Sequence, residues 1–210
     1  EDKQATTPST DGAPALNYVT KYVHDAVGHV IEERIPFGDD ATQSTKVLQS
    51  YGILGELLEE KREITPGAGD FAVTARTYDE NLNLKTLTGA EGQVTEQGYD
   101  ARNLLTSVKR GVGTPEQVEE TYHCDAEGQR AGFTDGNGHS SATLYDGHGR
   151  AAESRDPLGN GTKMTYDDGG NVTRVESRDA GNAVLAQSGT VYDLRDRPTE
   201  QKQLLFTDAP

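Results

Sequence analysis

The chain has 210 residues, a formal net charge of −15 at pH 7 and no tryptophan. Val, Leu, Ile and Phe contribute only 38 of these residues, and so low an aliphatic content with high charge argues against a thick hydrophobic core. Nine tyrosines supply apolar area that this count misses. We expect no nucleic-acid partner, because the 20 Lys and Arg residues are scattered, and no membrane span, because no stretch approaches ~20 apolar residues.

The N-terminal segment, residues 1–17, is polar and acidic. This composition differs from that of a signal peptide and predicts a flexible segment. The single cysteine, Cys124, excludes an internal disulfide and does not indicate a redox compartment.

A repeated dipeptide organises the rest of the chain. Tyr-Asp pairs begin at 78, 99, 145, 166 and 192, and related pairs begin at 24, 51 and 124. The intervals between these eight starts are 27, 27, 21, 25, 21, 21 and 26 residues, which indicates one unit with insertions in its loops. We expect a repeat array of about eight units over residues 18–206, followed by a tail, 207–210.

The third residue after each Asp position tolerates a left-handed backbone. It is glycine in five units, Asn103 and Asp196 in two others, and Leu82 in the one exception. Glycine enters positive φ freely, and the Asp side chain can accept hydrogen bonds from turn N–H groups. Tyr-Asp-x-x-Gly is therefore predicted to end a strand and begin a tight turn. The residues expected to define the repeat are Tyr51, Tyr78, Tyr99, Tyr145, Tyr166 and Tyr192; Asp25, Asp79, Asp100, Asp125, Asp146, Asp167 and Asp193; and Gly28, Gly55, Gly128, Gly149 and Gly170.

A second turn is predicted midway through several units. Gly89–Gly92, Asp135–Gly138 and Asp156–Gly159 begin at the same distance from their repeat starts. The segment Asp-Pro-Leu-Gly at 156–159 matches the preferences of a type I turn. Two turns in 21 residues leave two strands of roughly 5–7 residues, the usual strand length.

Residues 47–63 are the best helix candidate, because their apolar residues have near-helical spacing. Gly52 and Gly55 weaken a helix, and Tyr51 falls in the repeat register, so we favour strand there. The fold predicted for the chain is all-β, with tandem antiparallel hairpins.

Alternation along the strands places the repeated tyrosines on one face of the predicted sheet. Tyr22 and Tyr122 lie one strand period before His24 and Cys124, so their rings stay on that face. We expect a packed sheet face; the alternative is an exposed platform on which bases or sugars stack. Some apolar pairs, such as Leu84 with Leu87 and Val172 with Val175, are three residues apart, which a β-bulge after the first turn would reconcile.

Three consecutive segments carry a family resemblance. They are Thr-Leu-Tyr-Asp-Gly-His-Gly-Arg at 143–150, Ser-Arg-Asp-Pro-Leu-Gly-Asn at 154–160 and Thr-Tyr-Asp-Asp-Gly-Gly-Asn at 165–171. Together they resemble YD repeats of the Rhs family, in which Tyr-Asp-x-x-Gly-Arg/Asn-Leu is followed by Asp-Pro-x-Gly-Asn. The resemblance covers about residues 18–200 and is sharpest from 121 to 182, while His24 and Gly52 depart from the pattern.

The resemblance implies a continuous β-sheet that spirals into a hollow shell, of which this chain looks like a fragment of the wall. Relatives include bacterial polymorphic toxins, Tc toxin C components, wall-associated proteins and teneurins. In the toxins the shell encloses a C-terminal toxin domain. The implied partners are the remainder of the shell and such a domain, and the implied location is secreted or at the cell surface. No segment after Tyr192 resembles the family's autoproteolytic core.

The residues predict no enzyme, cofactor or metal site. Thirty-five carboxylates make close acidic pairs unavoidable, and no P-loop, nucleophile elbow or His-Glu-x-x-His motif occurs. His123 and Cys124 point to opposite faces of a predicted strand, so they cannot both ligate one metal ion from that strand. Calcium is an alternative for Asp135, Asn137 and His139 and for the loop 167–171, but turn chemistry explains both.

Three classes of function remain at this stage. We favour a structural, non-enzymatic shell segment; a module that binds a glycan or receptor through exposed tyrosines and turn loops is the main alternative, and an enzyme is the least favoured. Exposure of the tyrosines discriminates between the first two. A sheet segment of this kind also exposes edge strands, so edge-to-edge self-association is expected.

Overall fold

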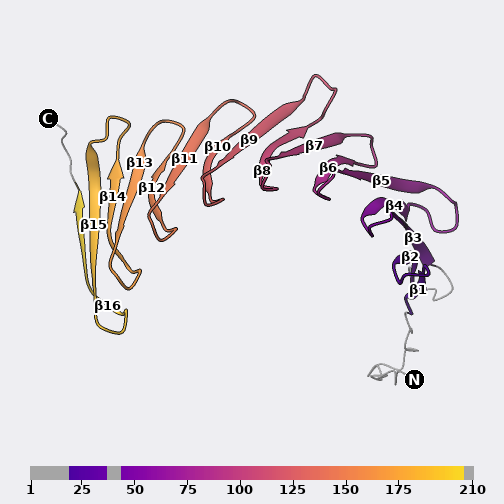
Figure 1. The fold of residues 1–210 in the computed structure, drawn as a ribbon, viewed down its shortest axis with the longest axis horizontal. Coiled ribbons are helices and arrows are strands. Elements are labelled where there is room, and N and C mark those ends of the chain that lie inside the picture. The colour runs from indigo at the N-terminus through magenta and orange to yellow at the C-terminus, as the bar shows by residue number, and fades with distance from the viewer. Residues whose placement is uncertain (1–18, 37–43, 206–210) are drawn as a thin grey trace, which may run out of the picture. The chain divides into compact units, whose positions relative to one another are not determined.

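A computed structural model describes residues 19–36 and 44–205 of the chain. These residues form sixteen strands in antiparallel hairpins and no helix (Figure 1). The predictions of an all-β fold and of tandem antiparallel hairpins are confirmed. The predicted flexible segment, 1–17, and the predicted tail, 207–210, lie outside the described residues.

The chain divides into two compact units, Glu1–Glu96 and Gln97–Pro210. In the first unit each strand pairs with the next strand in sequence. The strands of this unit are β1 (Lys21–His24), β2 (Val30–Pro36), β3 (Ser44–Tyr51), β4 (Leu57–Glu63), β5 (Phe71–Tyr78), β6 (Leu84–Thr88) and the first half of β7 (Val94–Tyr99).

Residues 47–63 form the end of β3, a turn and β4, and Val47 pairs with Arg62 across the hairpin. The strand assignment is therefore confirmed and the helical alternative is wrong. Gly52 and Gly55 both lie in the turn, where glycine interrupts what would otherwise be a helical pattern of apolar residues.

The second unit contains the end of β7 and nine further strands, which again pair in sequence order. Figure 1 shows these strands side by side, from magenta to yellow. They are β8 (Leu105–Arg110), β9 (Val118–Cys124), β10 (Arg130–Thr134), β11 (Ser140–Tyr145), β12 (Ala151–Arg155), β13 (Gly161–Tyr166), β14 (Val172–Arg178), β15 (Val184–Tyr192) and β16 (Pro198–Leu205).

One turn geometry recurs throughout the described residues. In each such turn the first residue's N–H donates to the fifth residue's carbonyl, the fourth residue's N–H donates to the first residue's carbonyl, and the fourth residue has positive φ. This is a three-residue hairpin loop that closes with a left-handed residue. Leu82 has the same conformation, with φ 64°, so the sequence exception does not change the turn. The turns begin at Asp25, Gly52, Asp79, Gly89, Asp100, Asp125, Asp135, Asp146, Asp156, Asp167, Asp179 and Asp193.

A β-bulge follows the turn in several hairpins, as the spacing of the apolar residues suggested. Tyr78 pairs with Leu84 but Thr77 pairs with Thr86, which makes Lys85 the extra residue. The hairpin of β13 and β14 has the same shift, since Tyr166 pairs with Val172 and Thr165 with Arg174. The bulge brings apolar residues three positions apart onto the face that carries the tyrosines.

Burial of apolar side chains is slight in both units. Among the described residues, only Val47 and Val108 are buried hydrophobic residues, at 3% and 6% exposure. Tyr22 is 54% exposed, and the other described tyrosines are half-buried rather than enclosed. The low aliphatic content of the sequence therefore corresponds to a sheet without a thick core, and stability must come largely from contacts within and between hairpins.

Candidate functional site

The turn that begins at Asp146 shows how each Asp side chain is used. Its Oδ1 accepts hydrogen bonds from the backbone N–H groups of His148 and Arg150, at 2.9 and 3.0 Å. Its Oδ2 accepts a hydrogen bond of 2.7 Å from Nε of Arg150. The backbone hydrogen bond from Arg150, with those from its side chain and from His148, lowers the pKa of Asp146 to about 2 although desolvation opposes the change.

The same arrangement recurs in the other Asp turns. In the turns that begin at Asp79, Asp135 and Asp167, for example, Oδ1 of the Asp accepts a hydrogen bond from the backbone N–H of the fifth turn residue. In most of them the fifth side chain also donates to Oδ2. The pKa values of seven further turn carboxyls are lowered, those of Asp25, Asp79, Asp100, Asp135, Asp156, Asp167 and Asp193.

The repeated tyrosines link one hairpin to the preceding one. The Tyr166 hydroxyl donates to the carbonyl oxygen of Ala151 at 2.8 Å, and the Tyr145 hydroxyl donates to that of Arg130 at 2.9 Å. Tyr78 and Tyr192 make the equivalent bonds to Leu57 and Val172, at 2.9 and 3.2 Å. Each acceptor is the first residue of the strand that follows the preceding turn, so the hydroxyl fixes where that strand begins.

Three tyrosines use a different acceptor. The hydroxyls of Tyr51 and Tyr99 donate to Gln49 and Gln97, and that of Tyr122 donates to Glu120. Each acceptor lies two residues earlier on the same strand, so these bonds hold a ring in place without joining hairpins.

Side chains at the fifth turn position also reach the next turn. Arg150 Nη1 donates to the carbonyl of Asp167 at 3.3 Å, and Gln129 Nε2 donates to the carbonyl of Gly149 at 2.8 Å. Asn171 Nδ2 donates to Asp196 Oδ1 at 2.8 Å. Successive turns of the second unit are thus joined by side-chain hydrogen bonds.

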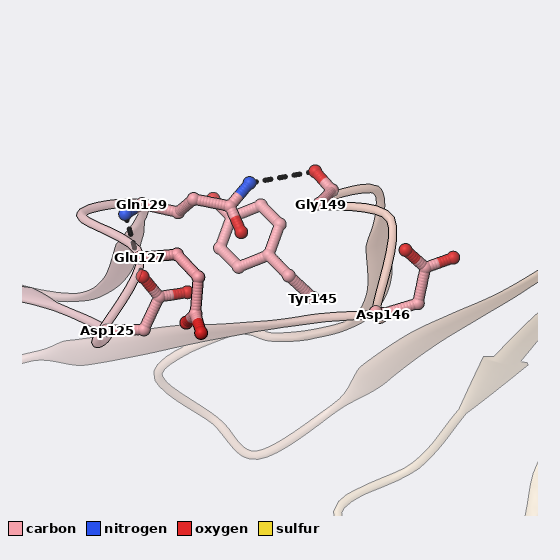
Figure 2. A pocket seen from close by; sticks show the side chains of 7 residues that line it. Asp125, Glu127, Gln129, Tyr145, Asp146 and Gly149 are labelled. Carbon is pink, nitrogen blue, oxygen red and sulfur yellow. Dashed lines mark hydrogen bonds between the residues drawn. The ribbon is translucent and has the colours of Figure 1, made fainter.

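Two surface grooves lie between successive turns of the second unit. The first, named here the Gln129 groove, has a volume of about 470 Å³ and is shown in Figure 2; the second, the Arg150 groove, has a volume of about 390 Å³. Six of the seven residues that line each groove occupy equivalent positions 21 residues apart; Asp125 and Gly169 are the exceptions. The Gln129 groove is lined by Asp125, Glu127, Gln129, Tyr145, Asp146, Gly147 and Gly149, and the Arg150 groove by His148, Arg150, Tyr166, Asp167, Asp168, Gly169 and Gly170.

The structure places the sequence-predicted repeat residues at the turns and at the strand ends before them. Sequence reasoning missed the role of the fifth turn position, whose side chain donates to the second carboxylate oxygen of most turn Asp residues and, in three turns, bonds to the next turn. Its signal is visible in the sequence, because seven of the eight repeat units have a polar hydrogen-bonding residue there and only Leu104 departs. The acceptors of the four tyrosine hydroxyls that join hairpins depend on strand pairing and have no sequence signal.

The residues considered for a metal have other interactions. His139 Nδ1 lies 3.0 Å from Asp135 Oδ2, and both residues belong to one turn. His123 is exposed and its neighbour Cys124 is half-buried on β9. Within residues 19–36 and 44–205, no group of three or more His, Cys, Asp or Glu side chains is placed to hold a metal ion, and no helix could cross a membrane.

Comparisons with known proteins identify the repeat. The family model described as RHS Repeat matches residues 78–115 and 145–184. Comparison with curated proteins found no match.

Similar solved structures contain Tc toxin components. The complex TcdB2-TccC3-Cdc42 has a TM-score of 0.51 and 16% identity over 79% of this chain and 11% of that chain. TcdB2-TccC3 without its hypervariable C-terminal region has a TM-score of 0.51 and 17% identity over 76% of this chain and 10% of that chain. A Photorhabdus luminescens Tc holotoxin pore with a mutated TccC3 has a TM-score of 0.51 and 15% identity over 85% of this chain and 13% of that chain.

This chain spans about a tenth of the length of the chains it matches. At these identities the similarity concerns the fold, which is an open antiparallel array of hairpins. The two matched segments share that fold and the turn chemistry described above. The family model therefore identifies residues 78–115 and 145–184 of this chain as RHS repeats.

Proposed function

We propose that this chain is a non-enzymatic segment of a protein shell, in which its hairpins form part of the wall around an enclosed toxin domain. The observation that supports this most directly is the series of hydroxyl-to-carbonyl bonds from Tyr145, Tyr166 and Tyr192 to the preceding hairpins. Hairpins joined in this way can extend a sheet without a second layer, as a wall requires.

The resemblance to Tc toxin structures supports the same function. Those structures are named for complexes that contain TcdB2 and TccC3, and this chain shares their fold over about 80% of its own length. By this proposal the partners of the chain are the remainder of the shell and the enclosed domain, and the protein acts outside the cytoplasm, as a secreted or cell-surface protein.

Glycan or receptor binding through tyrosine platforms has less support. Arg130 lies over the ring of Tyr122 and Arg150 over the ring of Tyr166, at 4.5 and 4.3 Å from the ring centres. A ring covered by a guanidinium does not offer that face to a sugar or base. Four hydroxyls are also used in bonds between hairpins, which a structural role explains.

Protease protection in the full-length protein tests the proposal. We expect an enclosed domain to resist digestion in the intact protein and to become sensitive when Tyr145→Phe and Tyr166→Phe together loosen the wall. Tyr22→Phe is the matched control, because the Tyr22 ring is exposed and has no hydroxyl bond among the described residues. A full-length protein in which no segment gains protection from the repeats would contradict the proposal.

A further inference from the structure

The Gln129 and Arg150 grooves are lined mostly by equivalent positions of the repeat but differ in charge. Gln129 and Arg150 occupy equivalent positions, as do Tyr145 and Tyr166. In the Arg150 groove the guanidinium makes three contacts. Its Nε donates to Asp146 Oδ2 at 2.7 Å and its Nη1 donates to the carbonyl of Asp167. The guanidinium also covers the Tyr166 ring. The cation that lines this groove is therefore supplied by the chain itself.

The Gln129 groove has a neutral amide at that position. Gln129 Nε2 donates to the carbonyl of Gly149, and the backbone N–H of Gln129 donates to Asp125 Oδ1 at 2.8 Å. Among the described residues, no side chain donates to Asp125 Oδ2, whereas Asp146 Oδ2 accepts a hydrogen bond from Arg150 Nε. Among the seven Asp residues of the repeat starts, Asp125, which follows Cys124, is therefore the one whose second carboxylate oxygen has no side-chain ligand in the described part of the chain.

A second carboxylate adds to this local charge. Figure 2 shows the carboxylates of Asp125 and Glu127 on the same side of the groove, below the Tyr145 ring, while the carboxylate of Asp146 points away from them. Glu127 is exposed and forms no ion pair within the described part of the chain. The groove is thus lined by three carboxylates, two of them on one side, and an aromatic ring, and no Lys, Arg or His among the described residues lines it.

The nearest arginines in sequence have other interactions. Arg102 pairs with Asp100 and donates to the carbonyls of Asp125 and Ala126 from the preceding turn. Arg130 covers the Tyr122 ring, and Arg150 pairs with Asp146.

We propose that the Gln129 groove binds the guanidinium of an arginine side chain presented by a partner peptide segment. The guanidinium would donate to Asp125 Oδ2 and to Glu127 and lie against the Tyr145 ring, as Arg150 does one repeat later. Arginine fits better than lysine, because its planar fork donates to several oxygens at once and stacks on an aromatic ring. This site is independent of the shell function proposed above.

The groove is open to solvent, so the interaction should be weak and sensitive to salt. Nuclear magnetic resonance is suited to such binding, with acetyl-arginine amide as the probe and acetyl-citrulline amide as its uncharged counterpart. We expect saturable chemical-shift changes at Gln129, Tyr145 and Glu127 with the arginine probe, weakened at least threefold by 0.5 M salt. The citrulline probe should cause none.

Variants make the assignment specific. Gln129→Arg supplies the guanidinium within the chain, so it should abolish the arginine-dependent shifts; Gln201→Arg, the same change on exposed β16, should preserve them. Glu127→Gln should weaken binding at least threefold, whereas Asp168→Asn in the Arg150 groove should have no effect.

Three results would overturn the proposal. The citrulline probe could cause chemical-shift changes equal to those of the arginine probe, or the Gln129→Arg variant could bind the arginine probe as strongly as the unchanged protein does. The third result is that neither probe causes shifts in this groove. A titration with calcium distinguishes a metal site. Shifts of the same residues at lower calcium than arginine concentrations, unaffected by Gln129→Arg, would also contradict arginine recognition.

Discussion

The Tyr166 hydroxyl donates a 2.8 Å hydrogen bond to the carbonyl oxygen of Ala151, the residue at which β12 begins after the preceding turn. Tyr166 also lies beneath the Arg150 guanidinium, which belongs to that same turn. The side chain of one repeat thereby stabilises the turn of the previous one, and the two hairpins should unfold as a coupled unit.

Tyr166→Phe should lower the free energy of unfolding by about 1 kcal/mol, because it removes one hydrogen bond and leaves the Ala151 carbonyl without its hydroxyl donor. Urea unfolding followed by circular dichroism measures this change. Tyr22→Phe is the control and should change stability much less. Equal effects of the two substitutions would show that the hydroxyl bond does not join the hairpins.

Gly170→Ala should destabilise the protein by roughly 1–2 kcal/mol, because the residue at position 170 has φ 90°, in the left-handed region. A Cβ at this position meets only Arg150 Nη1 at 3.9 Å, so the cost is conformational rather than steric. Gly147→Ala is the matched control, since Gly147 lies outside the left-handed region and its Cβ would meet nothing within 4 Å. Thermal denaturation of both variants tests the turn register.

Stability should fall as the pH is lowered from about 4 to about 2. The folded-state pKa of Asp146 is about 2 and lies below the unfolded value of 3.8, so its contribution is present above pH 3.8 and is lost as the pH falls through 2. Seven other turn carboxyls with lowered pKa values act in the same direction. Asp146→Asn should flatten the dependence of unfolding free energy on pH more than Asp168→Asn does. Equal slopes for the two variants would show that groups other than Asp146 cause the dependence.

Association through sheet edges should increase with salt. Strands β1 and β16 each have one side without a partner strand among the described residues, and such edges pair with other chains. The net charge of −15 opposes association at low salt, and this repulsion is screened above ~0.15 M, where the Debye length is about 8 Å. Light scattering at high protein concentration measures the effect, and a strict monomer at both low and high salt would contradict it.

Much of the fold could be predicted because the repeat carries local signals. Gly170 and Asn103 mark positive φ, Asp-Pro-Leu-Gly at 156–159 marks a turn, and the spacing of Val172 and Val175 indicates the bulge. Leu82 has the same conformation without that signal, because the turn's hydrogen bonds hold it there.

The contacts between repeats could not be predicted in the same way. That Tyr166 reaches Ala151, or that Gln129 reaches Gly149, depends on strand register and twist, which a single sequence does not specify. The difference between Gln129 and Arg150 at equivalent positions is visible in the sequence. Its effect on the charge of a groove follows only from the structure, which shows that each residue lines a groove between two turns.

Electron cryomicroscopy of the full-length protein tests the proposed shell function most directly. We expect residues 97–205 to form part of a closed wall, with Tyr145, Tyr166 and Tyr192 joining consecutive hairpins, and a separate domain of the same polypeptide to occupy the enclosed space. An open sheet with solvent on both faces and no enclosed domain would contradict it.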